Sequence, residues 1–231
     1  MIIDPENPNL AQLLVAAQKL TPLLDQIAFV GGCVIGLLIT DPGAAPIRAT
    51  RDVDVIVEIG SYAEFTLLEN HLRELGLRES RDIVCRWINA DMILDLMPTD
   101  PSILGFSNRW YGAALENAQQ IRIEQYEIRV ITTAYFLATK LEAFHDRGKN
   151  EDQMSHDLED IVTVIDGRVE IIKEISVAEV ELRRYLRDQF QSLLASRDFL
   201  EVLPGHLLPD AASQGRVGIV IDRIKKLTIE S

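Results

Sequence analysis

Apolar residues recur along the chain with two different periods, and the period predicts whether a segment forms a helix or a strand. In the first half of the chain, helices are predicted at 9–26, 33–40, 61–75 and 109–118. Short alternating or continuous apolar runs predict strands at 27–30, 52–59, 77–80, 84–88, 92–97, 121–123 and 126–130. Together these segments predict an α/β (α+β) fold, in which a mixed β-sheet has flanking helices.

Beyond residue 131 the pattern changes, because helical spacing continues while almost no strand signal is left. The helices expected in this part are 133–147, a helix that ends at 166, and further helices near 168–175, 177–195 and 213–229. We therefore expect two domains, an α/β domain at 1–131 and a C-terminal helical bundle at 132–231.

Two aspartates lie on the predicted strand 52–59. Because side chains alternate along a strand, Asp52 and Asp54 share one face, whereas the valines at 53, 55 and 57 point into a core. Like charges held this close are unfavourable unless a cation lies between them. Mg²⁺ is the expected cation, because it is a hard ion that favours oxygen ligands.

A third acid and a pair of glycines extend this pattern. Asp95 lies in the middle of the apolar strand 92–97, where a carboxylate is rarely buried without a partner or a metal. Gly31 and Gly32 connect the strand 27–30 to a predicted helix, so the backbone can approach a phosphate closely there. The sequence thus predicts a site that combines metal and phosphate binding.

Such a site is suited to nucleotidyl transfer. Two Mg²⁺ ions held by Asp52 and Asp54, with Asp95 near one of them, could activate an attacking hydroxyl and stabilise a departing pyrophosphate. In this scheme Asp95 positions or deprotonates the acceptor.

Three charged residues of the helical part also need an explanation. Lys140 lies within the apolar stripe of the helix 133–147. It is either a side chain whose stem covers the edge of the core or a cation that faces a phosphate. Asp157 and Asp160 flank the apolar stripe of the next helix and, taken alone, are ordinary surface acids.

The charge balance is acidic. The 36 acidic residues outnumber the 23 basic ones, and the formal net charge of −13 disfavours long polyanionic partners. The alternative is a local basic cleft, for which the candidates are Arg48, Arg51, Lys140, Arg147 and Lys149. The chain has two cysteines and no apolar run of the roughly 20 residues that span a bilayer, so a cytoplasmic protein outside the membrane is expected.

In order and spacing, these motifs resemble the polymerase-β-like nucleotidyltransferase superfamily. Its pattern is a glycine turn at a helix start, then Asp-x-Asp on a strand, then a third Asp on a later strand. More narrowly, the chain resembles the AbiEii/AbiGii toxin type, which carries an Arg-x-Thr-x-Asp-x-Asp run, a Lys-Leu-x-Ala helix and an Asp-x-x-Asp helix. The matching segments are 48–54, 138–143 and 157–161.

The resemblance implies Mg²⁺-dependent transfer of an NMP from an NTP to a hydroxyl acceptor, which is a tRNA or other RNA end, a protein or a small molecule. It implies that the helical domain closes the nucleotide cleft, and that the protein is a toxin with a cognate antitoxin. The implied catalytic residues are Asp52, Asp54, Asp95 and Asp157, of which the first three are also metal ligands. The implied nucleotide-binding residues are Gly31, Gly32, Arg51, Lys140 and Asp160.

Two other functions remain open. The first is a non-catalytic module of the same fold that binds a nucleotide or regulates a partner. The second is a Mg²⁺-dependent phosphohydrolase that uses the same acids to activate water.

Overall fold

The computed structural model describes residues 7–147 and 155–229. Contacts divide the chain into two compact units. The sheet unit comprises residues 1–37 and 48–132, and the helical unit comprises 38–47 and 133–231. The sequence predicted a single boundary near residue 131. The structure differs from this prediction because the segment 38–47 also belongs to the helical unit. Each unit is described by itself.

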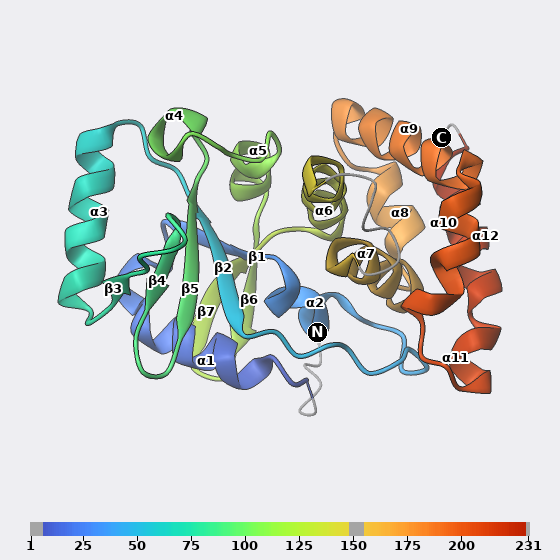
Figure 1. Ribbon diagram of the computed structural model, residues 1–231, viewed down its shortest axis with the longest axis horizontal. Coiled ribbons are helices and arrows are strands. Elements are labelled where there is room, and N and C mark those ends of the chain that lie inside the picture. The colour runs from blue at the N-terminus through green and yellow to red at the C-terminus, as the bar shows by residue number, and fades with distance from the viewer. Residues whose placement is uncertain (1–6, 148–154, 230–231) are drawn as a thin grey trace. The chain divides into compact units, whose positions relative to one another are not determined.

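The sheet unit is built on one mixed sheet. Its seven described strands have the order β3-β4-β5-β2-β1-β7-β6 (Figure 1). Their bounds are β1 (Ile27–Val30), β2 (Asp52–Val57), β3 (Arg78–Glu79), β4 (Arg86–Ile88), β5 (Ile93–Pro98), β6 (Gln119–Ile123) and β7 (Tyr126–Val130). β2 is antiparallel to β1 and parallel to β5, whereas β3, β4 and β5 form an antiparallel meander. The predicted mixed sheet is therefore confirmed.

Five α-helices and two 3₁₀ turns accompany the sheet in the described part of this unit. The α-helices are α1 (Leu10–Lys19), α2 (Ile35–Leu38), α3 (Tyr62–Glu74), α4 (Pro101–Leu104) and α5 (Tyr111–Glu116). α1 packs against β2 and β7. The predicted helix 9–26 is too long at its end, because α1 stops at Lys19 and Pro22 lies in a separate 3₁₀ turn, Thr21–Leu23. Ser61 caps α3 by accepting a hydrogen bond from the Glu64 backbone N–H.

The helical unit contains α6 (Thr133–Arg147), α7 (His156–Gly167), α8 (Ile171–Ser176), α9 (Val180–Ala195), α10 (Arg197–Val202), α11 (Ala211–Gly215) and α12 (Val217–Leu227). α6 packs against α7, α8 and α9, and α12 packs against α7, α8 and α9. Every regular element described after residue 132 is helical, so the predicted C-terminal bundle is confirmed. The sequence at 147–152 favours a turn between α6 and the next helix, and residues 148–152 of it lie outside the described residues.

The segment 38–47 belongs to the helical unit, and α2 does not continue through it to Thr40. The backbone N–H groups of Thr40 and Asp41 both donate to the Gly167 carbonyl, at 2.9 Å each. A Cβ atom on Gly167 would lie 2.5 Å from Ile39 Cδ1, so the glycine lets this segment approach α7. The predicted helix 33–40 is therefore wrong at its end, because α2 stops at Leu38 where these contacts begin.

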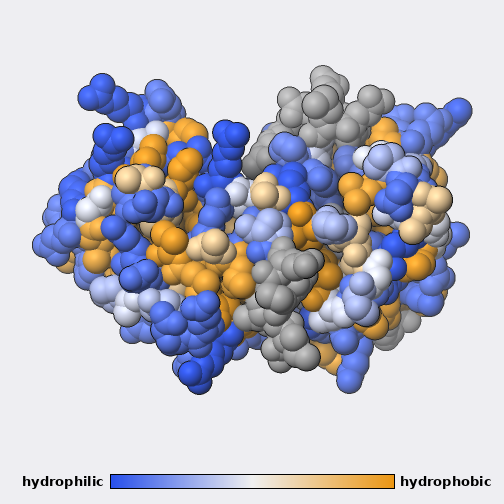
Figure 2. Space-filling view, turned by 90° about the horizontal axis from the view of Figure 1, so that it is seen from below, coloured by the Kyte–Doolittle hydropathy of each residue, from blue (hydrophilic) through white to orange (hydrophobic). Residues whose placement is uncertain are grey.

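Hydrophilic residues cover much of the face drawn in Figure 2, with apolar patches between them. Within the described ranges, no helix combines the length and hydropathy that a membrane span requires.

Candidate functional site

Gly31 and Asp54 lie against each other where β1 ends. Val30, the last residue of β1, pairs with Asp54 across the antiparallel β1–β2 ladder. Gly31 follows with φ +71°, a left-handed conformation that glycine adopts without steric penalty. A Cβ atom on Gly31 would lie 2.0 Å from Asp54 Oδ2, so only glycine leaves room for this carboxylate. The glycine turn therefore fixes the space in which Asp54 lies.

Asp52, Asp54 and Asp95 lie on neighbouring strands. Along β2 the half-buried Asp52 and Asp54 alternate with the buried Val53 and Val55, as the strand period predicted. In the parallel register between β2 and β5, Asp95 is the partner of Asp54. Asp95 is only 9% exposed. The sheet thus brings the three predicted acids onto adjacent positions.

Arg86 on β4 links two of these acids. Its Nε donates to Asp95 Oδ1 and its Nη2 to Asp95 Oδ2, both at 2.7 Å. The same Nη2 donates to Asp52 Oδ2 at 2.8 Å. Because Arg86 pairs with Asp95 across the β4–β5 ladder, the guanidinium reaches both carboxylates on one side of the sheet. A protein cation therefore lies where the strand acids alone predicted a metal.

The charges around Arg86 also shift nearby titrations. The hydrogen bond to Asp95, aided by the charges of Asp95 and Asp52, raises the pKa of Arg86, so the guanidinium stays protonated. Burial, together with the Asp95 charge, raises the pKa of the neighbouring Cys85 thiol to about 11. Cys85 is thus a neutral thiol near pH 7 and not a nucleophile of this site.

The donor chemistry of the site fits a hard cation in part. Asp52 and Asp54 present carboxylate oxygens on one strand face, and Mg²⁺ favours such ligands. Both oxygens of Asp95 accept hydrogen bonds from Arg86. Within the described ranges, no group of three or more His, Cys, Asp or Glu side chains is arranged to hold a metal. Asp95 as a metal ligand stays a prediction, and it requires Arg86 to release this carboxylate.

Asn9 connects the glycine turn to the residues that precede β2. Its side chain is fully buried, and its Oδ1 accepts a hydrogen bond from the Thr50 backbone N–H at 2.8 Å. Its Nδ2 donates to the carbonyls of Arg48 at 3.2 Å and Gly32 at 3.5 Å. One amide thereby holds both segments that carry the predicted site residues, which makes Asn9 a positioning residue.

Lys140, Asp157 and Asp160 form a buried ion cluster between α6 and α7. Lys140 Nζ lies 3.0 Å from Asp157 Oδ1 and 2.8 Å from Asp160 Oδ2. The side chains of both aspartates are 2% exposed and that of Lys140 is 15% exposed. The interpretation of Asp157 and Asp160 as surface acids is therefore wrong, because their spacing turns both toward Lys140. Lys140 is held by two carboxylates and does not extend into solvent.

The remaining predicted residues are distributed over the two units. Gly32 is buried at the start of a 3₁₀ turn, Gly32–Val34, and Arg51 is exposed immediately before β2. Of the candidates for a basic cleft, Arg48 and Arg51 lie in the sheet unit and Lys140 in the helical unit. Lys149 lies outside the described residues, as does the side chain of Arg147.

Sequence reasoning missed Arg86 and Asn9. Arg86 interrupts the apolar run at 84–88 as Asp95 interrupts the run at 92–97, and two opposite charges in adjacent predicted strands were the available signal. Asn9 carried no comparable signal, because an asparagine before a helix is normally read as a cap. Here its amide bonds to other segments, and no side-chain cap is formed.

The fold has counterparts among solved structures. It resembles JHP933 from Helicobacter pylori, at 12% identity, with a TM-score of 0.50 and coverage of 97% of this chain and 94% of that one. An antigenic nucleotidyltransferase-like protein from Paracoccidioides brasiliensis is 18% identical, with a TM-score of 0.49, over 88% of this chain and 94% of that one. The sequence matches no family model and no curated protein. At this identity the likeness to JHP933 shows a shared fold alone.

Proposed function

We propose that the protein is a Mg²⁺-dependent nucleotidyltransferase, which moves an NMP from an NTP to a hydroxyl acceptor. The observation that carries the proposal is the juxtaposition of Asp52 and Asp54 with the Gly31 turn and with Asp95 on the adjacent strand. Nucleotidyl transfer requires carboxylates for a metal beside a backbone turn that a phosphate can approach. The order of the motifs in the sequence supports the same function.

The three strand acids have two different roles in this proposal. When bound, Mg²⁺ would neutralise charge on the triphosphate and lower the pKa of the attacking hydroxyl. Asp52 and Asp54 would supply carboxylate oxygens to it. Asp95 would orient or deprotonate the acceptor, and the two hydrogen bonds from Arg86 hold its carboxylate in one orientation until the substrates bind.

The finer assignments come from the resemblance to the AbiEii/AbiGii type and belong to the same proposal. Lys140, Asp160, Arg51 and the two glycines would contact the nucleotide, and Asp157 would act as a further active-site acid. The acceptor would be a tRNA, a protein or a small molecule in the cytoplasm. A toxin role with a cognate antitoxin also rests on the motifs.

The decisive experiment offers each α-labelled NTP, with Mg²⁺, total RNA and total protein, to the purified chain and separates the labelled products. Asp54→Asn keeps the side-chain shape but removes a ligand charge. We expect it to lower labelling by more than the roughly 10–100-fold that loss of an outer-shell partner produces. The matched control is Asp91→Asn, because Asp91 is an exposed acid in the turn before β5. Equal labelling by wild type and Asp54→Asn would contradict the proposal.

Arg86 favours one alternative, a non-catalytic nucleotide-binding or regulatory module of the same fold. Its guanidinium neutralises Asp52 and Asp95 without a metal. A module that performs no metal chemistry would need such a protein cation beside its acids. Calorimetry with the Mg²⁺ complexes of ATP, GTP, CTP and UTP separates the two functions. Binding without labelled product in the preceding assay would favour the module.

A further inference from the structure

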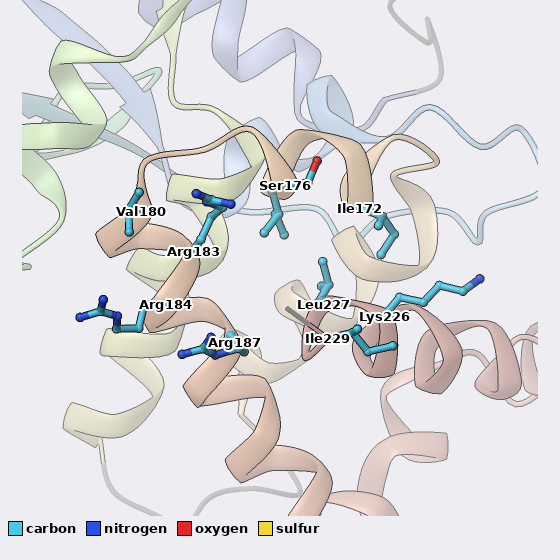
Figure 3. A pocket seen from close by; sticks show the side chains of 10 residues that line it. Ile172, Ser176, Val180, Arg183, Arg184, Arg187, Lys226, Leu227 and Ile229 are labelled. Atoms are coloured by element: carbon cyan, nitrogen blue, oxygen red, sulfur yellow. The ribbon is translucent and has the colours of Figure 1, made fainter. Parts of the chain in front are cut away.

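A groove lies between α8, α9 and the end of α12 in the helical unit. Its volume is about 240 Å³, and Figure 3 shows its side chains projecting from the three helices. This volume is below the roughly 300–1,000 Å³ of pockets that enclose a drug-sized ligand. The groove is suited to a few side chains of a larger partner.

Four cations surround this groove, and none of the described residues that line it is acidic. Arg183, Arg184 and Arg187 follow one another along α9, and Lys226 projects from α12 on the other side (Figure 3). Arg187 is paired with Asp188 and Lys226 with Asp222, both on their own helices. In a chain of net charge −13, a groove with only basic charges is a local exception.

Arg183 is the cation that most requires a ligand. Its Nε is buried, and among the described residues this atom has no hydrogen-bond partner. A buried donor without an acceptor is unfavourable, and the penalty is larger for a charged group. Arg183 lines the groove, so a carboxylate or phosphate there would balance the charge of its guanidinium, which makes Arg183 the anchor for an anion.

The remaining lining is aliphatic. Ile175 and Leu227 line the groove and are buried, whereas Val180 is 62% exposed and Ile229 is 67% exposed. Val177, which directly follows the lining residue Ser176, is 78% exposed. Exposed aliphatic side chains around a recess are typical of a surface that a protein partner covers.

We propose that this groove binds an acidic segment of a partner protein through aliphatic anchor residues. An amphipathic helix would place leucine or isoleucine against the aliphatic lining and glutamate or aspartate beside Arg183 and Arg184. RNA fits less well, because its bases stack on aromatic side chains and the described lining contains none. At physiological salt, charges beyond about 8 Å are largely screened, so the local cations outweigh the net negative charge.

All residues that line the groove belong to the helical unit, whereas the strand acids belong to the sheet unit. The inference therefore does not depend on the proposed nucleotidyl transfer, and each can fail without the other.

The test selects a displayed library of random peptides, about 16 residues long so that helices can form, on the purified full chain. We expect enriched peptides that are acidic and carry aliphatic residues three or four positions apart. Fluorescence anisotropy with the enriched peptides then compares two groove variants, Arg183→Gln and Val180→Asp. Each should weaken binding by about tenfold, because loss of a charged hydrogen bond or of an apolar contact has that effect.

The matched control is Arg197→Gln, because Arg197 is an exposed arginine on α10 paired with Glu201. It should leave peptide affinity unchanged, and circular dichroism should show that all three variants fold. Three outcomes would overturn the proposal: no enriched peptide, enrichment of basic peptides, or equal binding by wild type and Arg183→Gln. Tighter Arg183-dependent binding of a labelled RNA oligonucleotide would also overturn it.

Discussion

At the scale of single residues, Arg86 supplies the positive charge that stabilises Asp52 and Asp95 without a metal. Asp95 is largely buried, and a buried carboxylate needs a cation or several hydrogen-bond donors. The guanidinium supplies both, and the same nitrogen that serves Asp95 also reaches Asp52. Metal binding by these acids would therefore compete with an ion pair that already stabilises the fold.

Replacing Arg86 by glutamine tests this competition. Without metal, Arg86→Gln should lower the free energy of unfolding by about 1–3 kcal/mol, because Asp95 loses its charged donors. Mg²⁺ should then raise the Tm of Arg86→Gln more than that of the wild type, since the ion can neutralise the released acids. Differential scanning calorimetry with and without Mg²⁺ measures both effects.

The control for this variant is Arg73→Gln. Arg73 is a more exposed arginine of the same unit that pairs with Glu79, so its loss should change the Tm little and leave the response to Mg²⁺ unaltered. Equal Mg²⁺ responses in wild type and Arg86→Gln would show that the guanidinium does not compete with the metal.

Single residues also show what the sequence could predict about the site. Asp52, Asp54 and Asp95 were recognisable because a charge within an apolar strand is conspicuous, and Gly31 because the turn needs it. Arg86 offered a signal, an opposite charge in the adjacent predicted strand, but neither strand alone shows the register that places it opposite Asp95. Its contact with Asp52 was not recognisable, since the pairing of β2 with β5 is a long-range one that local residue patterns do not encode.

At the scale of elements, α6 and α7 are joined by one buried ion cluster. Lys140 on α6 lies between Asp157 and Asp160 on α7, which are one turn apart and therefore face the same way. Burial makes this cluster sensitive to the loss of any member, because the remaining charges cannot reach water. The pair of helices is thus held by charge as well as by its apolar contacts.

Lys140→Met should therefore destabilise the protein by about 3–5 kcal/mol, as expected when one partner of a buried ion pair is removed. Urea unfolding followed by circular dichroism measures this change. Adding Asp157→Asn to Lys140→Met should restore part of the loss, because one of the stranded carboxylates is then neutral. The exposed Lys173 on α8 provides the control, and Lys173→Met should be close to neutral.

An unchanged free energy of unfolding in Lys140→Met, together with lost nucleotide binding, would contradict this account. It would show that Lys140 acts on a ligand and contributes nothing to the packing of the two helices.

Long elements were predicted more accurately than short ones. The long helices α3, α6 and α9 were expected within a few residues of their bounds, because several turns of apolar periodicity define them. Among the short helices, α5 and α8 were predicted and α11 was merged with α12, but α4 and α10 were not predicted, since four to six residues carry less than two turns of pattern. Local caps begin them instead, such as the side chains of Asp100 and Ser196.

At the scale of the whole molecule, the chain leaves the sheet unit, joins the helical unit over 38–47, and returns to form β2. Pro42, Gly43 and Pro46 favour a loop in this segment, but its attachment could not be predicted from local pattern. Arg216 makes this attachment, because its Nη2 donates to Asp41 Oδ2 at 2.6 Å and its Nε donates to the buried Asp166 at 2.8 Å. Thr40 adds a hydrogen bond to Glu170 at 2.7 Å.

This attachment should weaken in acid. The hydrogen bond from Arg216, with that from the Gly43 backbone, lowers the pKa of Asp41 below 3.8. A carboxyl whose pKa is depressed in the folded state stabilises the protein above its unfolded pKa, and the stabilisation is lost as pH falls through the folded value. Asp41→Asn should therefore lower the free energy of unfolding by about 1 kcal/mol at pH 7, and this difference should shrink below pH 4.

Thermal unfolding of wild type and Asp41→Asn between pH 7 and pH 3 measures the difference, and Asp222→Asn is its control. Asp222 is 60% exposed and pairs only with Lys226 one turn away among the described residues, so its loss should have little effect at any of these pH values. If the gap between wild type and Asp41→Asn stayed constant down to pH 3, the ionised carboxylate would not be what holds 38–47 to the helical unit. The backbone hydrogen bonds to Gly167 would then carry the attachment, because they do not titrate in this range.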